Sequence, residues 1–143
     1  MKIIATNKRA RFDYAIESTL LAGIILTGPE TKSARLGHVQ LKGSYVQILG
    51  NELFLINTHI SPYSFAKGQP HEDTRSRKLL VNKKELDQLT AAKQQGRHLF
   101  PVSIGIRGRF IKVEIGIGAS KKLHDKREII KKRDQVLDQA RAM

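Results

Sequence analysis

The chain has 143 residues, which is enough for one domain with its own hydrophobic core and too few for two. Its 26 lysine and arginine residues against 13 aspartate and glutamate residues give a formal net charge of +13, so a polyanion is the expected partner. The absence of cysteine excludes disulfide scaffolds, thiolate metal sites and cysteine nucleophiles.

The first predicted element is a long strand over residues 12–26, in which apolar side chains alternate with polar ones. Gly23 is the expected position of a bulge or bend in this strand. Residues 27–28 break the strand, and Pro29 at a first helical turn predicts a short helix to about residue 36. Gly37 is suited to end that helix in the left-handed conformation.

Two β-hairpins and a second helix are predicted in the rest of the chain. β-Rich runs on either side of a short glycine-containing turn are typical of hairpins, and Asn82 and Gly96 are suited to begin and end a helix. A polar segment over residues 61–74 predicts a long loop. The predicted elements are strands 45–49 and 52–56, the helix 83–94, and strands 99–106 and 110–117 about the turn Arg107-Gly108-Arg109.

Antiparallel strands interrupted by short helices predict a mainly β fold, an oligonucleotide-binding-type antiparallel β-barrel over residues 1–120. The composition then changes to a charged segment without aromatic residues, so residues 121–143 are predicted to form a separate basic C-terminal tail. Leu123, Ile130 and Leu137 are seven residues apart and would form one apolar stripe on a helix. We expect the tail to be helical when bound; a helix packed on its own barrel is the alternative.

Motifs for catalysis and for metal or cofactor binding are missing from the sequence. The five histidines lack the spacing of metal ligands, and neither a dinucleotide-binding fingerprint nor a Walker motif is present. His71-Glu72-Asp73 and His124-Asp125 are candidate acid–base groups, for which solvated polar segments are the simpler interpretation. We therefore predict no catalytic residue, metal or cofactor. Without a long apolar run for a secretory signal or a membrane span, a cytoplasmic protein is expected.

The cationic side chains indicate RNA as the polyanion. They occur in small clusters between apolar stretches, as expected of a folded surface that binds phosphates in a salt-dependent way. A cationic surface kept only for solubility is the alternative. Candidate side chains that offer a plane for base stacking, each of which also suits ordinary packing, are Tyr45, Tyr63, Phe65 and His124.

Five segments of the chain carry longer motifs: NKRARFDYAIE at 7–17, LTGPETKSAR at 26–35, HISPY at 59–63, RSRKLL at 75–80 and KKLHDKR at 121–127. In this order they resemble the family of tmRNA-binding proteins known as small protein B (SmpB). The resemblance implies a barrel that is not an enzyme, binds the tRNA-like domain of tmRNA and accompanies it, with elongation factor Tu, to stalled ribosomes. It further implies that the tail occupies the empty mRNA channel near the decoding centre, so that the stalled peptide is tagged and the ribosome is released.

The same resemblance assigns functional residues. Asp125 is expected to orient the start of the tail helix, while Lys126 and Arg127 contact phosphate; eight basic against four acidic side chains in the tail suit a channel lined by RNA. The implied RNA-binding residues are Asn7, Lys8, Arg9, Glu30, Lys32, Ser33, Arg35, Tyr45 and Lys112. The implied tail residues at the decoding centre are Lys121, Lys122, His124, Asp125, Lys126, Arg127, Lys131, Lys132 and Arg133.

The chain departs from the family pattern at Leu21, Thr31, Ala34 and Ala119-Ser120. Leu21 stands where many members carry a glutamate that faces tmRNA, so the resemblance does not assign that contact to this chain. Two other functions stay open from the sequence. One is a ribosomal or initiation-type factor with a barrel, and the other is a metal-independent ribonuclease that uses His71 or His124.

Overall fold

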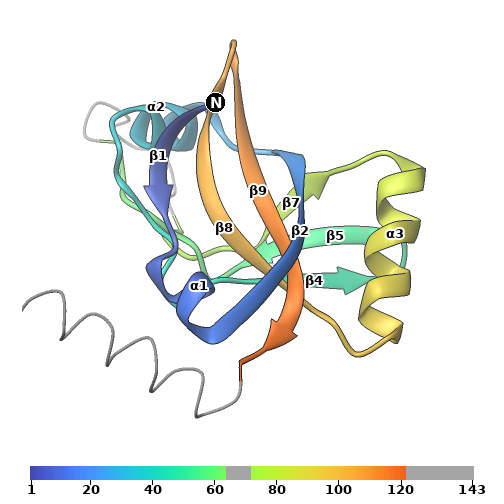
Figure 1. The fold of residues 1–143 in the computed structure, drawn as a ribbon. Helices are drawn as coiled ribbons and strands as arrows, with labels where there is room; N and C mark the ends of the chain where they lie inside the picture. The colour runs from blue at the N-terminus through green and yellow to red at the C-terminus, as the bar shows by residue number, and fades with distance from the viewer. Residues whose placement is uncertain (64–71, 122–143) are drawn as a thin grey trace, which may run out of the picture.

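The computed structural model describes residues 1–63 and 72–121, and most of this part is antiparallel β-structure. The strands of the main sheet are β1 (Lys2–Thr6), β2 (Tyr14–Ile24), β4 (Tyr45–Leu49), β5 (Glu52–Ile56), β7 (Arg77–Leu80), β8 (His98–Arg107) and β9 (Phe110–Ser120). They are ordered β1-β8-β9-β2-β7-β5-β4 (Figure 1). The edge strand β4 packs against β8, so the sheet curls into a barrel. A second, two-stranded sheet pairs β3 (Val39–Gln40) with β6 (His59–Ile60).

Three helices of the described part lie outside the barrel: α1 (Lys8–Asp13), α2 (Gly28–Arg35) and α3 (Lys83–Gln94). Both longer helices begin with a capping box, in which the N-cap side chain and a glutamate three residues later bond each other's backbone N–H. Left-handed glycines follow them, Gly37 at φ 85° and Gly96 at φ 84°. Figure 1 shows α2 beside the tip of the β8–β9 hairpin and α1 near the opposite end of these strands.

The core lies inside the curled sheet and under α3. A smaller apolar cluster of Ala10, Phe100 and Val102 lies under α1, where the Tyr14 ring stacks on Phe100 with a centroid distance of 4.3 Å. The fully buried apolar side chains of the main core include Leu53, Leu55, Ile60, Leu79, Leu89, Ile104, Val113 and Ile115.

The predicted mainly β fold with short helices is confirmed, and so are most of its central elements. The first hairpin and α3 have the predicted bounds, and α2 begins and ends one residue earlier than expected. The second hairpin is longer than predicted, because β8 and β9 remain paired from Arg107↔Phe110 to His98↔Gly118. Residues 64–71 of the predicted loop and residues 122–143 of the predicted tail lie outside the described residues.

The prediction of one strand over residues 12–26 is wrong at both ends. Residues 8–13 form α1, and β2 ends at Ile24. The helix forms because Asn7 is held on β8 through bonds to the carbonyls of Pro101 and Val102, which directs Ala10 into the smaller apolar cluster. Gly23 is not a bulge: it pairs regularly with Lys112 and Leu80, and the register shift in β2 lies between Ile16 and Ser18.

Candidate nucleic-acid interface

Asn7 lies at the junction of β1 and α1 and fixes the helix to the barrel. Its backbone N–H donates to the Val102 carbonyl at 2.8 Å, and its Nδ2 donates to the Pro101 carbonyl at 2.9 Å. Lys8 and Arg9 follow on the first turn of α1, and both side chains are exposed. Asn7 therefore holds in place the segment that presents these two cations.

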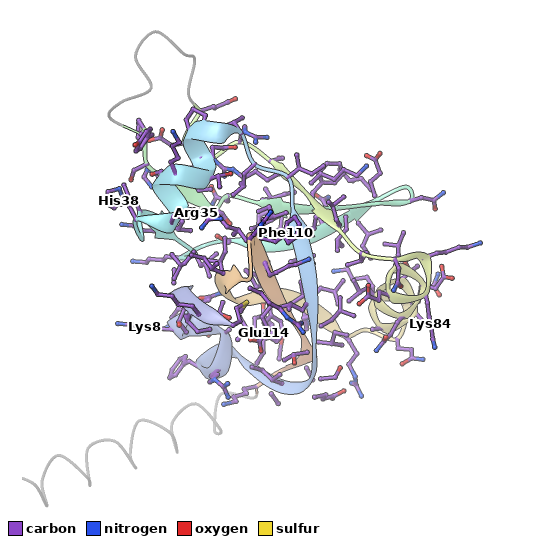
Figure 2. The ribbon with its side chains drawn as sticks, turned by 90° about the horizontal axis from the view of Figure 1, so that it is seen from above. Lys8, Arg35, His38, Lys84, Phe110 and Glu114 are labelled. Atoms are coloured by element: carbon purple, nitrogen blue, oxygen red, sulfur yellow. The ribbon has the colours of Figure 1, made fainter. Side chains whose placement is uncertain are left out.

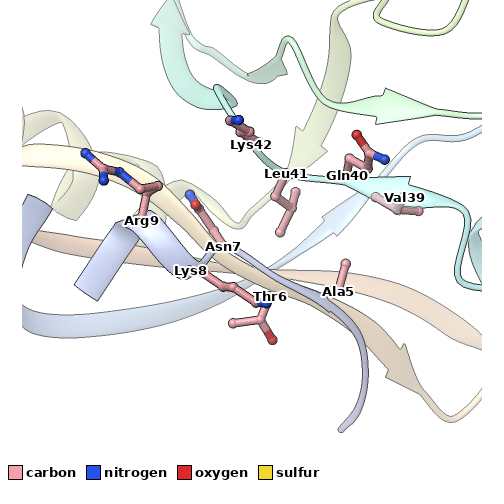
Figure 3. Close-up of a pocket in the computed structure, with 9 residues that line it drawn as sticks. All are labelled: Ala5, Thr6, Asn7, Lys8, Arg9, Val39, Gln40, Leu41 and Lys42. Carbon is pink, nitrogen blue, oxygen red and sulfur yellow. The ribbon is translucent and has the colours of Figure 1, made fainter. Parts of the chain in front are cut away.

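A groove of about 320 Å³ lies between this segment and the chain around β3; we call it the α1 groove. Figure 3 shows residues 5–9 on one side and residues 39–42 on the other. Apolar side chains and the amides of Asn7 and Gln40 line its interior, and three cations stand along it. None of the described lining residues carries a carboxylate: they are Ala5, Thr6, Asn7, Lys8, Arg9, Val39, Gln40, Leu41 and Lys42.

The cations of the α1 groove differ in how far they are already engaged. Arg9 forms an exposed ion pair with Asp13 at 3.2 Å, and its guanidinium lies 4.7 Å from the centroid of the Phe12 ring. An exposed pair of this kind contributes little stability, so a phosphate can compete for the guanidinium. Tyr45 follows Lys42 across a turn closed by the Ser44 N–H and the Leu41 carbonyl at 2.9 Å. Its side chain is 49% exposed, which leaves the ring available for contact.

A second groove, of about 330 Å³, lies at the tip of the β8–β9 hairpin; we call it the hairpin groove. Lys112 belongs to it, and Arg35 joins it indirectly because its guanidinium donates to the Arg109 carbonyl at 2.8 Å. Figure 2 labels Arg35 on α2 and Phe110 at the hairpin, both on the side of the view away from Lys84 of α3. The described residues that line the groove again include no carboxylate: Gly23, Ile24, Leu26, Thr31, Leu80, Arg109, Phe110, Ile111 and Lys112.

Glu30 and Ser33, two of the residues assigned to RNA binding by resemblance, lie inside the protein. Glu30 is 2% exposed and Ser33 is fully buried, with its hydroxyl donating to the Ser61 carbonyl at 2.7 Å. The Glu30 carboxylate accepts bonds from Arg75 and from Arg77, whose Nε lies 2.8 Å from Oε2. These contacts tie α2 to the chain that leads into β7, so both side chains position α2 instead of facing a ligand.

The charge of Glu30 is stabilised by this network. Burial alone raises its pKa, but hydrogen bonds from Arg75, the Thr27 amide and Arg77 outweigh burial and lower the pKa to about 2, from an ordinary value of 4.5. Arg77 is itself 0% exposed, and burial lowers its pKa while the bonds to Glu30 oppose that shift. Glu30 is therefore the counter-charge that allows an arginine to lie in the core.

The other predicted residues on α2 face outward. Lys32 is exposed, and its ammonium lies 5.5 Å from the centroid of the Tyr63 ring. Arg35, at the C-terminal end of the helix, is exposed apart from its bond to the hairpin tip. Of the positions that depart from the family pattern, Ala34 is fully buried in the core and Leu21 is half-buried opposite Glu114 on β9.

Lys121 marks where the predicted tail leaves the barrel. Its backbone N–H donates to the Asp13 carbonyl at 2.9 Å, and its Nζ donates to the Arg11 carbonyl at 2.6 Å. The end of β9 is therefore fixed against α1. The remaining predicted tail residues, which lie outside the described residues, are Lys122, His124, Asp125, Lys126, Arg127, Lys131, Lys132 and Arg133.

The predicted RNA-binding residues are thus divided between separate places. Asn7, Lys8 and Arg9 line the α1 groove, Lys112 lines the hairpin groove, and Arg35 bonds the carbonyl of Arg109, a residue of that groove. Sequence reasoning missed Gln40 and Lys42, since a single amide and a single lysine near a turn carry no signal. It also missed Phe110, although it predicts the neighbouring Arg107-Gly108-Arg109 segment as the turn of a hairpin.

Other kinds of site find no support in the described residues. No group of three or more histidine, aspartate or glutamate side chains there is placed to hold a metal ion. No helix of residues 1–63 and 72–121 has the length and apolar composition to cross a membrane. His71 and His124, the two histidines of the ribonuclease alternative, lie outside the described residues.

Comparison with known proteins gives consistent similarities over nearly the whole chain. The family model described as SmpB protein matches residues 4–143. The SsrA-binding protein of Syntrophotalea carbinolica is 44% identical over 144 residues, which cover 100% of this chain and 96% of that protein. The SsrA-binding protein of Caldicellulosiruptor bescii is 48% identical over 139 residues, covering 96% and 88% respectively. That of Caulobacter vibrioides is 46% identical over 144 residues, covering 99% and 95%.

A solved structure supports the same similarity at the level of the fold. It is described as "tmRNA-SmpB: a journey to the center of the bacterial ribosome". Its matching chain is 40% identical in sequence and superposes with a TM-score of 0.68, covering 83% of this chain and 85% of that one.

Proposed function

The chain belongs to the SmpB protein family, and from that premise we propose that it binds tmRNA and acts with it in trans-translation on the ribosome. The observation that carries the proposal is the extent of the match, which runs from residue 4 to residue 143 and includes both grooves. A family relationship over the whole chain, at above 40% identity to SsrA-binding proteins, supports a shared RNA partner.

The two grooves supply the chemistry that this function needs. RNA offers phosphates to the cations of both grooves and unpaired bases to exposed aromatic side chains. We propose that Lys8, Arg9, Lys32, Arg35 and Lys112 contact phosphate or base edges, and that Tyr45 contributes an aromatic face. Asn7, Glu30 and Ser33 act by holding α1 and α2, since their side chains bond within the protein.

The finer parts of the mechanism belong to the same proposal. The RNA segment that is bound is the tRNA-like domain, and elongation factor Tu accompanies the complex to the stalled ribosome in the cytoplasm. Residues 121–143 form the tail that occupies the empty mRNA channel near the decoding centre. The bonds of Lys121 to α1 support this division, because they end the barrel at the point where the tail motif begins. The protein works by binding and positioning RNA, without a catalytic step of its own.

A competition gel shift at fixed physiological salt tests the proposed partner. Labelled tRNA-like domain of tmRNA is bound to the full chain and challenged with mature tRNA and with an unrelated RNA duplex of equal length. Strong preference for the tmRNA domain is the expected result. Equal competition by all three RNAs would contradict the proposal and favour a basic barrel of the ribosomal or initiation-factor kind, because phosphate contacts alone do not discriminate between RNAs.

A further inference from the structure

Phe110 has an unusual position for an aromatic side chain. It is 67% exposed, the highest value among the large hydrophobic side chains in residues 1–63 and 72–121. Exposed phenyl groups forgo the stabilisation of burial, and this ring is available for contact with a ligand. Leu80, at 50% exposure, lies in the same groove and extends the apolar surface.

The hairpin tip holds the ring in place from two sides. Phe110 pairs with Arg107 across a turn in which Gly108 takes φ 62°, a conformation that suits glycine. The next residue back, Arg109, has its carbonyl bonded by Arg35 of α2 at 2.8 Å. The ring is therefore presented by a braced turn, which lowers the entropy lost when a ligand binds.

A cation shares the groove with this ring. The Lys112 ammonium lies 5.7 Å from the Phe110 centroid. A Cβ at Gly23 would stand 3.7 Å from the same ammonium and 3.3 Å from the Leu80 Cβ, so a side chain there would crowd the place where Lys112 lies. The groove thus combines an apolar wall, one aromatic face and the cations Lys112 and Arg109, with no carboxylate among its described lining residues.

These properties match a nucleotide better than a peptide. A base stacks on a single ring and brings its own phosphates within reach of neighbouring cations. A protein ligand would have to bring a flat ring and acidic groups from separate residues, whereas one nucleotide carries a flat base and phosphates together. Among the described residues that line the groove, Phe110 is the one aromatic residue, so the groove offers a stacking face for one base.

We propose that the hairpin groove binds one unpaired base of the tmRNA, which stacks on Phe110 while Arg109 and Lys112 bind its flanking phosphates. The proposal rests on the proposed function and adds a position that discriminates single-stranded from paired RNA. Bases inside a duplex keep their faces stacked on each other, so only a loop or bulge base can enter the groove.

The test uses two substitutions at Phe110 in the full chain. Phe110→Leu keeps an apolar side chain of similar size and removes the flat ring, and we expect it to weaken binding to the tRNA-like domain about fivefold or more. The dependence of affinity on salt stays unchanged, because no cation is removed. Phe110→Trp keeps the stacking face and binds within about threefold of the unsubstituted chain.

The sequence contains no tryptophan, so Phe110→Trp also introduces a single fluorophore. Its emission is quenched when RNA binds if a base stacks on the indole. The matched control is Leu49→Trp, at a residue 53% exposed on the β4–β5 hairpin and outside both grooves, whose emission stays unquenched. A set of RNAs that each lack one loop base identifies the stacked base. The RNA without that base binds the unsubstituted chain more weakly than the intact RNA does, whereas Phe110→Leu binds both RNAs equally.

The outcomes separate this inference from the proposed function. If the unsubstituted chain prefers the tmRNA domain, but Phe110→Leu binds within twofold of it or the Phe110→Trp emission does not change, the groove does not stack a base. If the unsubstituted chain shows no preference for tmRNA, both the proposed function and this inference are overturned.

Discussion

Glu30→Gln is the substitution that most directly separates a structural role from RNA contact at α2. Glutamine keeps the shape of the side chain and removes the charge that compensates Arg77, which is 0% exposed. Removing one partner of a buried ion pair costs about 3–5 kcal/mol, since the remaining charge stays desolvated. A domain of this size has a total stability of about 5–15 kcal/mol, so we expect the melting temperature to fall by roughly 10–20 °C.

Urea unfolding followed by far-ultraviolet circular dichroism measures this loss. The matched control is Glu17→Gln, because Glu17 forms an ion pair with Arg97 at 3.1 Å whose side chains are 47% and 42% exposed. That surface pair contributes less than about 1 kcal/mol. If Glu30→Gln unfolds with the same free energy as Glu17→Gln, within about 1 kcal/mol, then Glu30 is not the counter-charge of the core and the reasoning fails.

The Glu30–Arg77 ion pair also predicts how the stability of the fold depends on pH. The pKa of Glu30 is lowered from 4.5 to about 2 by folding, so its contribution is fully present above pH 4.5 and is lost as the pH falls toward 2. That difference in pKa corresponds to about 3 kcal/mol at neutral pH, which agrees with the cost estimated for the substitution. The gap in stability between the unsubstituted chain and Glu30→Gln therefore closes between pH 4.5 and pH 2. A gap that stayed constant over this range would refute the assigned charge.

Three further predictions concern the RNA faces and the hairpin between them. Lys112→Ala reduces the slope of log affinity against log salt concentration by about 0.7–0.9, which corresponds to one phosphate contact. The control Lys84→Ala, on the distant α3, leaves the slope unchanged (Figure 2). An unchanged slope for Lys112→Ala would place that lysine off the RNA. Deleting residues 122–143 leaves the tmRNA gel shift within about threefold and abolishes peptide tagging in translation on a truncated message; continued tagging would refute the tail assignment. Gly116→Ala places a methyl group against the Phe100 ring and lowers the free energy of unfolding by about 1–3 kcal/mol, measured by urea titration; unaltered stability would contradict the tight packing there.

Elements with strong local signals were predictable from the sequence. Asn82 with a glutamate three residues later sets the start of α3, and the Gly50 turn at φ 62° sets the register of the first hairpin. The short elements were missed because their causes are tertiary. The helix α1 depends on Asn7 bonding to β8, and β7 depends on pairing with β2 and β5 around the buried Arg77.

The types of residue at the candidate site were predictable from the sequence, but the direction in which each side chain faces was not. Net charge indicated a polyanion, and resemblance supplied the RNA and the residues, but neither distinguishes a side chain that faces RNA from one that holds a helix. Glu30 and Ser33 lie among outward-facing residues in one short motif, and only their burial separates them from Lys32. The exposure of Phe110 was equally invisible, because an aromatic residue at the start of a strand is more often part of the core.

The helix α2 is bonded to the rest of the protein at both of its ends, and one of these bonds reaches the hairpin groove. The Glu30 network fixes the first turn of α2 to Arg75 and to Arg77 at the start of β7, and Arg35 at its last turn bonds the carbonyl of Arg109. The hairpin tip is thus braced by a helix whose own position depends on a buried ion pair. From Lys112 to Ser120 the chain runs eight residues along β9, about 26 Å, so the groove and the end of β9 lie at opposite ends of one strand pair. The proposed base site at the tip and Lys121 beside α1 therefore lie at opposite ends of the β8–β9 hairpin, and the interior residues of α2 fix the end that carries the tip.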